Sequence, residues 1–220
     1  MPMDGVMLGF VARQLDTILR DGRVDRVIQP EKDEIHLMIR SQGANHRLVL
    51  RAANAARVHL SEHAKTGPME PPMLCMLFRK YLCGGRVLAV RRIAGDRILE
   101  IDVSNLSELG DPVTRTLVVE IMGRHSNIIL RTEDGRIIDA ARHVGQDISR
   151  VRQVMPGLPY AYPPTQGKLD PETADAEAVA SALENAGGKL EKAIGASIAG
   201  FSPQAAREAA VRIGMDGSAL

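Results

Sequence analysis

Short apolar segments separated by turn signals recur along residues 24–140, and no other feature constrains the fold as tightly. They are rich in valine, isoleucine and leucine, and several alternate apolar with polar positions. This pattern is typical of half-buried β-strands joined by tight turns. The candidate strands are residues 24–28, 34–39, 47–50, 57–60, 86–93, 97–103, 114–121, 127–131 and 136–140. We predict that seven or eight of these nine segments form a sheet, paired mainly antiparallel.

Two helices are predicted to pack against this sheet. Apolar residues from Val6 to Leu19 mostly follow helical spacing, Asp4 is suited to cap the start, and Gly22 is suited to the end. The second helix is predicted over residues 73–83, because proline favours the first turn of a helix and Gly84 stops it. Strands and helices arranged in this way indicate the α+β class.

Prolines are concentrated near the middle of the second half of the chain, at positions 156, 159, 163, 164 and 171. Such a stretch is stiff and favours a connection between domains. Beyond it the sequence is alanine-rich, and helices are predicted over residues 173–185, 189–198 and 203–213. We therefore predict two domains, residues 1–165 and residues 166–220.

The composition narrows the classes of partner. The formal net charge is +1, with a small basic excess in residues 1–160 and a small acidic excess in residues 161–220. This balance favours a local phosphate-facing patch over general attraction to polyanions. Aromatic residues make up 3% of the chain and tryptophan is absent, so a platform that stacks single-stranded bases is not expected.

Neither a membrane segment nor a metal site is predicted. No apolar run reaches the roughly 18 residues that suggest a membrane helix, and the N-terminus lacks the pattern of a signal peptide. Cys75 and Cys83 do not form the spacing typical of a zinc site. Because unpaired thiols suit a reducing compartment, we expect a cytoplasmic protein.

A polar insert between two predicted strands is the first candidate binding site. Its residues are Gly123, Arg124, His125, Ser126 and Asn127. Glycine lets the backbone bend at the strand end, and the polar side chains are donors that suit phosphate or ribose oxygens. The alternative is a solvated hairpin tip, which the spacing alone favours.

The second candidate lies between two predicted helices, at Gly200, Phe201 and Ser202. Ser202 is suited to cap the helix that begins at Pro203. Backbone N–H groups at such a start attract phosphate, although a plain helix–helix turn explains the pattern equally well.

The third candidate is the pair Asp96 and Arg97 at the tip of a predicted hairpin. The arginine could donate to phosphate, and the aspartate could accept from an amine or a 2′-hydroxyl group. The two charges could equally neutralise one another at the surface, and the pattern alone favours that interpretation.

Several segments together resemble a known family. They are residues 70–80, 95–101, 108–111, 120–127 and 156–160. These segments resemble the N-terminal region of the NFACT family, also called fibronectin-binding-protein-A-like, and residues 200–203 resemble its helix-hairpin-helix. The resemblance implies an α+β fold: an Fpg/MutM-like antiparallel β-sandwich with helices, followed by a small all-α helix-hairpin-helix domain. It also implies an N-terminal fragment, without the coiled coil and NFACT-R domain of family members.

The same resemblance implies a role in ribosome quality control. Family members bind large ribosomal subunits obstructed by peptidyl-tRNA, and recruit a tRNA, alanyl-tRNA in bacteria, to promote C-terminal tailing of the stalled peptide. The ribosome performs peptidyl transfer, so we expect a non-enzymatic adaptor with no cofactor, no metal and no small-molecule substrate. The residues that match the tRNA-binding motifs of the family are Asp96, Arg97, Glu120, Met122, Gly123, Arg124, His125, Ser126 and Asn127.

Two other functions remain open. After removal of Met1, the secondary amine of Pro2 could act as the Schiff-base nucleophile of an Fpg-like DNA glycosylase. Met3 stands where such enzymes need an acidic residue, which disfavours this alternative. The other alternative is a surface fibronectin-binding adhesin, which rests on the second name of the family and has no export signal to support it.

Overall fold

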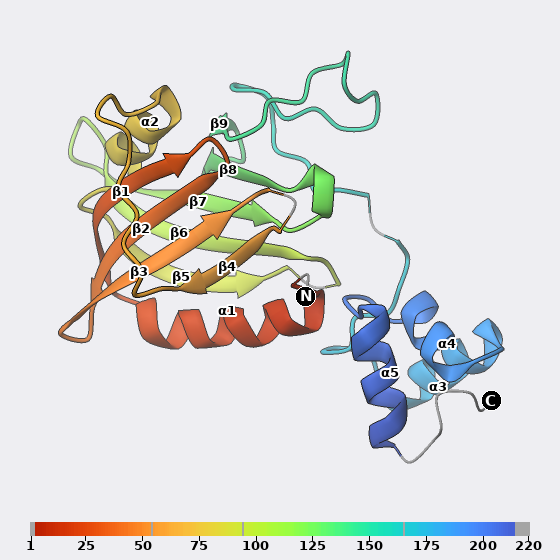
Figure 1. The fold of residues 1–220 in the computed structure, drawn as a ribbon. Helices are drawn as coiled ribbons and strands as arrows, with labels where there is room; N and C mark the ends of the chain where they lie inside the picture. Colours follow the sequence, from red (N-terminus) through yellow and green to blue (C-terminus); the bar gives the residue numbers. More distant parts are fainter. Residues whose placement is uncertain (1–2, 54, 94, 165, 214–220) are drawn as a thin grey trace.

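The computed structural model describes residues 3–53, 55–93, 95–164 and 166–213. An antiparallel sheet is packed against helix α1 (Gly5–Leu19) and helix α2 (Met73–Leu82), and a separate group of helices lies beyond it (Figure 1). The strands are β1 (Arg23–Glu31), β2 (Glu34–Ser41), β3 (Ala44–Arg51), β4 (Arg57–Leu60), β5 (Arg86–Arg92), β6 (Ile98–Leu106), β7 (Pro112–Glu120), β8 (Asn127–Thr132) and β9 (Ile137–Ala140). The α+β class is confirmed.

The described strands form one nine-stranded sheet, in the order β4-β3-β2-β1-β5-β6-β7-β8-β9. We expected seven or eight strands; the count is higher because the short β4 and β9 both pair, at the two edges of the sheet. A single register pair, Arg23 with Arg86, joins β1 to β5 and divides the sheet into two halves. The expected β-sandwich is not confirmed as two separate sheets, because both halves belong to one hydrogen-bonded order.

One apolar core lies between the two halves of the sheet and the helices. Leu37 and Leu117 contribute to it from the two halves, Leu15 from α1 and Phe78 from α2, and all four are fully or almost fully buried. Successive side chains of a strand point to opposite faces, so each half of the sheet presents one set of its apolar residues to this core.

Helix α1 begins where the sequence predicts, and its start borders the candidate site. The Asp4 carboxylate accepts a hydrogen bond from the Met7 amide at 2.8 Å and so caps the helix. Its buried residues at helical spacing are Leu8, Ala12, Leu15 and Leu19. Burial of this face fixes the rotation of α1, and the start of the helix lies at the end of the sheet nearest the C-terminal helices (Figure 1).

After β9 the chain stays on the sheet. Residues 141–162, here called the strap, cross the face of β6–β8 that points away from the main core, and Val144 and Val154 form an antiparallel bridge within it. A second small core lies beneath the strap and contains Ile98, Val118, Ile129, Ile137, Ala140 and Val154. We expected a linker from residue 156 onwards; its first residues instead pack on the sheet, because Tyr160 covers part of this second core.

The three C-terminal helices have their own apolar core. They are α3 (Ala176–Ala186), α4 (Leu190–Ser197) and α5 (Pro203–Arg212), within a few residues of their predicted bounds. Leu190, Ile194 and Ala206 are among the buried residues of this core. A domain boundary at residue 165 is consistent with this separate core and stays a prediction.

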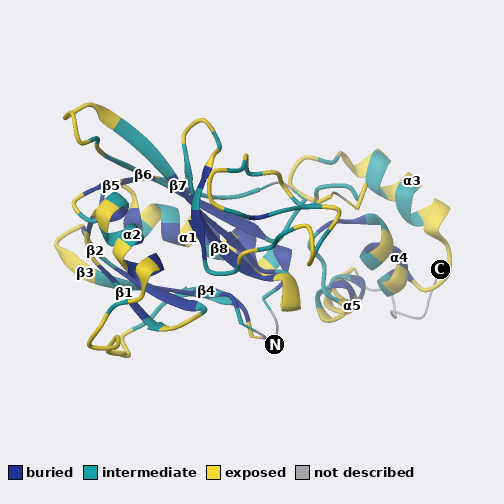
Figure 2. Cartoon of the chain, turned by 90° about the horizontal axis from the view of Figure 1, so that it is seen from above, coloured by how far each residue is buried: buried dark blue, intermediate teal, exposed yellow. Residues whose placement is uncertain are grey.

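Arg92 links the segment that precedes α3 to the sheet. Its side chain is 4% exposed and lies 3.1 Å from Asp170 and 3.3 Å from Glu172. Figure 2 shows that buried residues are concentrated in the strands, whereas the hairpin tips and loops are exposed. In the ranges described, no helix has the length and apolar character needed to cross a bilayer.

Candidate functional site

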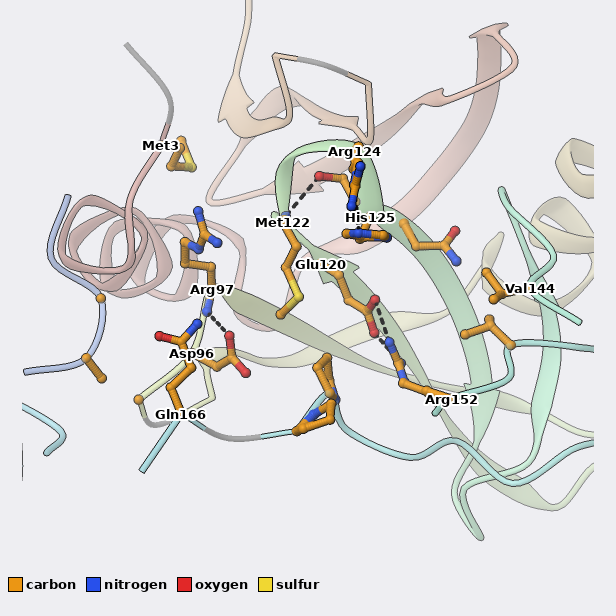
Figure 3. A pocket seen from close by; sticks show the side chains of 18 of the residues that line it. Met3, Asp96, Arg97, Glu120, Met122, Arg124, His125, Val144, Arg152 and Gln166 are labelled. Carbon is orange, nitrogen blue, oxygen red and sulfur yellow. Dashed lines mark hydrogen bonds and ion pairs between the residues drawn. The ribbon is translucent and has the colours of Figure 1, made fainter. Parts of the chain in front are cut away.

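A cleft of about 1750 Å³ lies where the sheet, the strap and the C-terminal helices meet. Its lining includes Asp96 and Arg97 from the β5–β6 hairpin, residues 124–127 from the β7–β8 connection, and residues 200–203 from the α4–α5 turn. The three candidate sites are more than 20 residues apart in sequence, yet the fold brings them to one cavity. Part of this lining is drawn in Figure 3.

The β7–β8 connection is a single turn of 3₁₀-helix, Gly123–His125. Gly123 has a φ of +57°, in the left-handed region that glycine adopts without strain. Arg124 and His125 are exposed, and the Arg124 Nε donates to the His125 Nε2 at 3.0 Å. This turn presents a guanidinium group and an imidazole to the cleft.

Ser126 and Asn127 have a different role from the one expected. Both are buried, at 0% and 2% exposure. The Ser126 hydroxyl donates to the Gly123 carbonyl at 2.7 Å and accepts from the Met122 amide at 2.9 Å, so it closes the turn. The Asn127 side chain is bonded to the backbone N–H and C=O of Arg142, each at 2.9 Å. Their polar atoms hold the turn and the strap together, so they do not form a donor surface for a ligand.

Glu120 is also buried, at 1% exposure. Arg152 of the strap donates to its two carboxylate oxygens at 2.5 and 3.0 Å, and the Tyr160 hydroxyl donates at 2.8 Å. Burial, together with the nearby Glu120 charge, raises the pKa of Tyr160 well above its ordinary value. Both Glu120 carboxylate oxygens are therefore bonded to the strap, although the residue borders the cleft (Figure 3).

Asp96 and Arg97 do not form a side-chain ion pair. The Asp96 carboxylate accepts from the backbone amide of Arg97 at 2.7 Å, which stabilises the bend of the hairpin. Among the residues that the structure describes, no carboxylate lies within 4.0 Å of the Arg97 guanidinium group. Met122 is half-buried and lies between Arg97 and the pair Arg124 and His125 (Figure 3).

Most carboxylates of the cleft are bonded to protein groups, whereas several of its cationic side chains are not. Its carboxylates are Asp4, Asp33, Asp96, Glu120 and Asp170. Asp4, Asp96 and Glu120 accept hydrogen bonds from protein donors, and Asp170 pairs with Arg92. In contrast, Lys32, Arg97 and Arg124 have no ion pair within the described ranges. The cleft therefore offers uncompensated cationic groups, which suit phosphate oxygens.

The α4–α5 turn faces the start of α1. The Ser202 hydroxyl accepts from the Ala205 amide at 3.2 Å and so caps α5. The same hydroxyl donates to the Asp4 carboxylate at 2.6 Å, and the Ser202 amide lies 3.4 Å from it. A protein carboxylate therefore occupies the helix start where we expected a phosphate, while Phe201 is half-buried at the edge of the cleft.

The expectations about a metal site and about a Pro2 nucleophile can be compared with the described residues. No group of three or more His, Cys, Asp or Glu side chains among them is arranged to hold a metal ion. Pro2, the nucleophile of the glycosylase alternative, lies outside the described residues.

Sequence comparison identifies relatives over the whole length of the chain. The family profile described as "NFACT N-terminal and middle domains" matches residues 4–219. The "Rqc2 homolog RqcH" of Bacillus subtilis is 37% identical over 217 residues, which is 98% of this chain and 38% of that protein. The protein of the same name in Streptococcus suis is 41% identical over 179 residues, 80% of this chain and 32% of that protein. The chain thus spans about a third of the length of these relatives.

Solved structures of the same fold include two from streptococci. The N-terminal domain of the fibronectin-binding protein PavA of Streptococcus pneumoniae has a TM-score of 0.90 and 33% identity, covering 96% of this chain and 79% of that one. The N-terminal part of the fibronectin/fibrinogen-binding protein of Streptococcus suis has a TM-score of 0.90 and 37% identity, covering 97% and 80%. The large antiparallel sheet with its helices is therefore the fold of this group of domains.

Proposed function

Because the chain belongs to the NFACT family, over its N-terminal and middle domains, we propose that it is a tRNA-binding adaptor of ribosome quality control. We place its binding partner at the cleft between the sheet, the strap and the α4–α5 turn. The complete activity that we propose is the one implied by the family: tRNA, alanyl-tRNA above all, is held on large ribosomal subunits that carry peptidyl-tRNA. The stalled peptide is then extended at its C-terminus by the peptidyl transferase of the ribosome.

One observation carries the proposal. Arg97 and Arg124, from two separate hairpins, border the same cleft without a carboxylate partner in the described ranges. Guanidinium groups present several N–H donors in a plane and match phosphate oxygens well. Two such groups on a rigid sheet can position the protein on a sugar-phosphate backbone without recognising the base sequence.

The other polar residues of the cleft act in support. His125 is exposed beside Arg124 and is available to a phosphate or a ribose hydroxyl. Asp96 supports the site indirectly, because its carboxylate accepts a hydrogen bond from the backbone amide of Arg97. The α4–α5 turn contains residues 200–203, whose sequence resembles the helix-hairpin-helix of the family. Because Asp4 already occupies its helix start, we assign the main phosphate contacts to the arginines.

A salt-dependent binding experiment tests this function. We expect the protein to bind unfractionated bacterial tRNA in fluorescence anisotropy, with an affinity that falls as salt rises. Arg97→Ala and Arg124→Ala should each weaken binding and lower the salt slope by about one. Arg136→Ala is the matched control, since Arg136 is an exposed arginine in the β8–β9 turn outside the cleft.

A protein that binds no tRNA near physiological salt would contradict the proposal. So would affinities of the two variants equal to that of the control. Unchanged thermal unfolding of all three variants would show that any loss arises from the binding site itself.

The second candidate function is fibronectin binding, which the names of two structural relatives favour. Binding of the purified protein to immobilised fibronectin tests it directly. Binding to fibronectin with none to tRNA would favour this alternative.

A further inference from the structure

Part of the strap projects beside the cleft as a short finger. The backbone bridge between Val144 and Val154, with N···O distances of 2.9 and 2.8 Å, closes the base of this finger, which comprises residues 145–152. Ile148 and Val151 within it are 67% and 78% exposed, and both border the cleft. Two exposed apolar side chains thus adjoin a cavity whose other walls carry unpaired arginines.

Four internal hydrogen bonds stabilise the finger. The Gly145 carbonyl accepts from the amides of Ile148 and Ser149 at 3.2 and 3.0 Å. The Ser149 hydroxyl in turn accepts from the amides of Val151 and Arg152 at 3.3 and 3.2 Å. The backbone therefore directs the exposed side chains, and their place at the cleft is a property of the fold.

The base of the finger is anchored on the sheet by Arg152. Its guanidinium group bonds both oxygens of Glu120, and its Nε donates to the Ala161 carbonyl at 2.5 Å. The guanidinium carbon also lies 5.0 Å from the centre of the Tyr160 ring. Since Glu120 is 1% exposed, removal of Arg152 would leave a buried carboxylate without its ion-pair partner, with only the Tyr160 hydroxyl still donating to it.

We propose that residues 145–152 form a wall of the RNA site, and that Glu120 is a positioning residue that holds this wall through Arg152. Ile148 and Val151 cover apolar faces of ribose and base, while the arginines across the cleft bind phosphates. This inference rests on the proposed function and deepens it. It gives Glu120 a role in binding although none of its atoms meets the ligand.

Two variants test separately the apolar contact of the finger with RNA and the anchoring of the finger by Glu120. Ile148→Ser combined with Val151→Ser removes the apolar wall at exposed positions, where the fold does not depend on it. Glu120→Gln keeps the shape of the side chain and removes the charge that holds Arg152. The matched controls are Leu109→Ser, an apolar residue 91% exposed outside the cleft, and Glu133→Gln, an exposed residue in the β8–β9 turn.

Two readouts are needed. The first is binding of unfractionated bacterial tRNA at several salt concentrations. The second is amide hydrogen exchange of residues 144–154 without RNA, with the exchange of β6 and β7 as a measure of the intact fold. We expect both the double variant and Glu120→Gln to bind about tenfold more weakly, with the salt slope of the wild type, because no phosphate contact is lost. Only Glu120→Gln should accelerate exchange in the finger.

The outcomes decide the proposal. Wild-type affinity in the double variant would overturn the apolar wall. Faster exchange in Glu120→Gln with unchanged affinity would overturn the positioning role, as would a salt slope lowered to that of Arg97→Ala. If the wild-type protein bound no tRNA, the proposed function would fail, and the wall would fail with it. The exchange measurement would still decide whether Glu120 holds the finger.

Discussion

The backbones of Gly5 and Gly200 are in direct contact, although the two residues are at opposite ends of the chain. The Gly5 amide donates to the Gly200 carbonyl at 2.8 Å, and a Cβ atom on Gly5 would lie 2.5 Å from the Gly200 Cα. This contact joins the start of α1 to the α4–α5 turn. It therefore fixes the position of the C-terminal helices at the border of the cleft.

Gly5→Ala is expected to destabilise the protein by about 1–3 kcal/mol, because the new methyl group has no room against a backbone atom. Urea denaturation measures this loss. Gly195→Ala is the control, since Gly195 lies in α4 with open space around its Cα. That change should stabilise the helix by about 0.5–1 kcal/mol. If Gly5→Ala were as stable as the wild type, the two backbones would not be in contact in solution.

A double-mutant cycle should detect the hydrogen bond between Asp4 and Ser202, whose oxygens lie 2.6 Å apart. Each alanine variant loses a helix cap and should cost about 1 kcal/mol. We expect the effects on the free energy of unfolding to differ from additivity by about 0.5–1.5 kcal/mol, because the residues share this bond. Asp175→Ala, which removes only the cap of α3, should be additive with Ser202→Ala. Strict additivity of the first pair would argue against the contact.

Variants of Asp96 test whether its hydrogen bond to the Arg97 backbone supports tRNA binding at the cleft. Its carboxylate oxygen accepts from the Arg97 amide, and the side chain of asparagine retains such an oxygen. Asp96→Asn should therefore keep tRNA affinity, whereas Asp96→Ala should weaken it severalfold with the salt slope unchanged. Anisotropy titrations of both variants measure the difference. Equal losses would mean that the Asp96 charge itself is needed.

The stability of the protein should decline in mild acid because of His36. This residue is 1% exposed, and burial lowers its pKa below the ordinary value of 6.5 despite the opposing effect of Glu34, 2.8 Å away. Below about pH 6.5, His36 binds a proton in the unfolded chain but stays neutral in the folded protein, so the free energy of unfolding falls as pH falls. The midpoint of urea denaturation, measured between about pH 7 and pH 5, follows this decline.

His36→Gln should flatten that decline, because glutamine does not titrate and can still donate to Glu34. His63→Gln is the control, since His63 is exposed. Parallel curves for the wild type and His36→Gln would exclude His36 as the source of the acid sensitivity.

Local pattern was sufficient for most of the secondary structure. Asp4 as a cap, Gly84 as a stop and the alternation in the segment that became β6 each act within a few residues, so the sequence alone locates the helices and strands closely. The strap was missed because its order depends on distant groups. Nothing near Tyr160 in the sequence indicates that its hydroxyl bonds Glu120, 40 residues earlier. The signal in the sequence is a glutamate at the end of an apolar segment, followed some 30 to 40 residues later by an arginine and tyrosines.

At the site, the order of residues along the chain is enough to identify the available side chains: the guanidinium groups of Arg97 and Arg124, the imidazole of His125, and Gly123, which bends the β7–β8 turn. Which of the polar side chains remain without a protein partner depends on how distant segments pack in the folded molecule. Ser126, Asn127 and Glu120 belong to the same motif, yet their polar atoms are bonded to the turn and the strap. The reason is physical: a polar group taken out of water must find a partner, and the partners come from segments that only folding brings together.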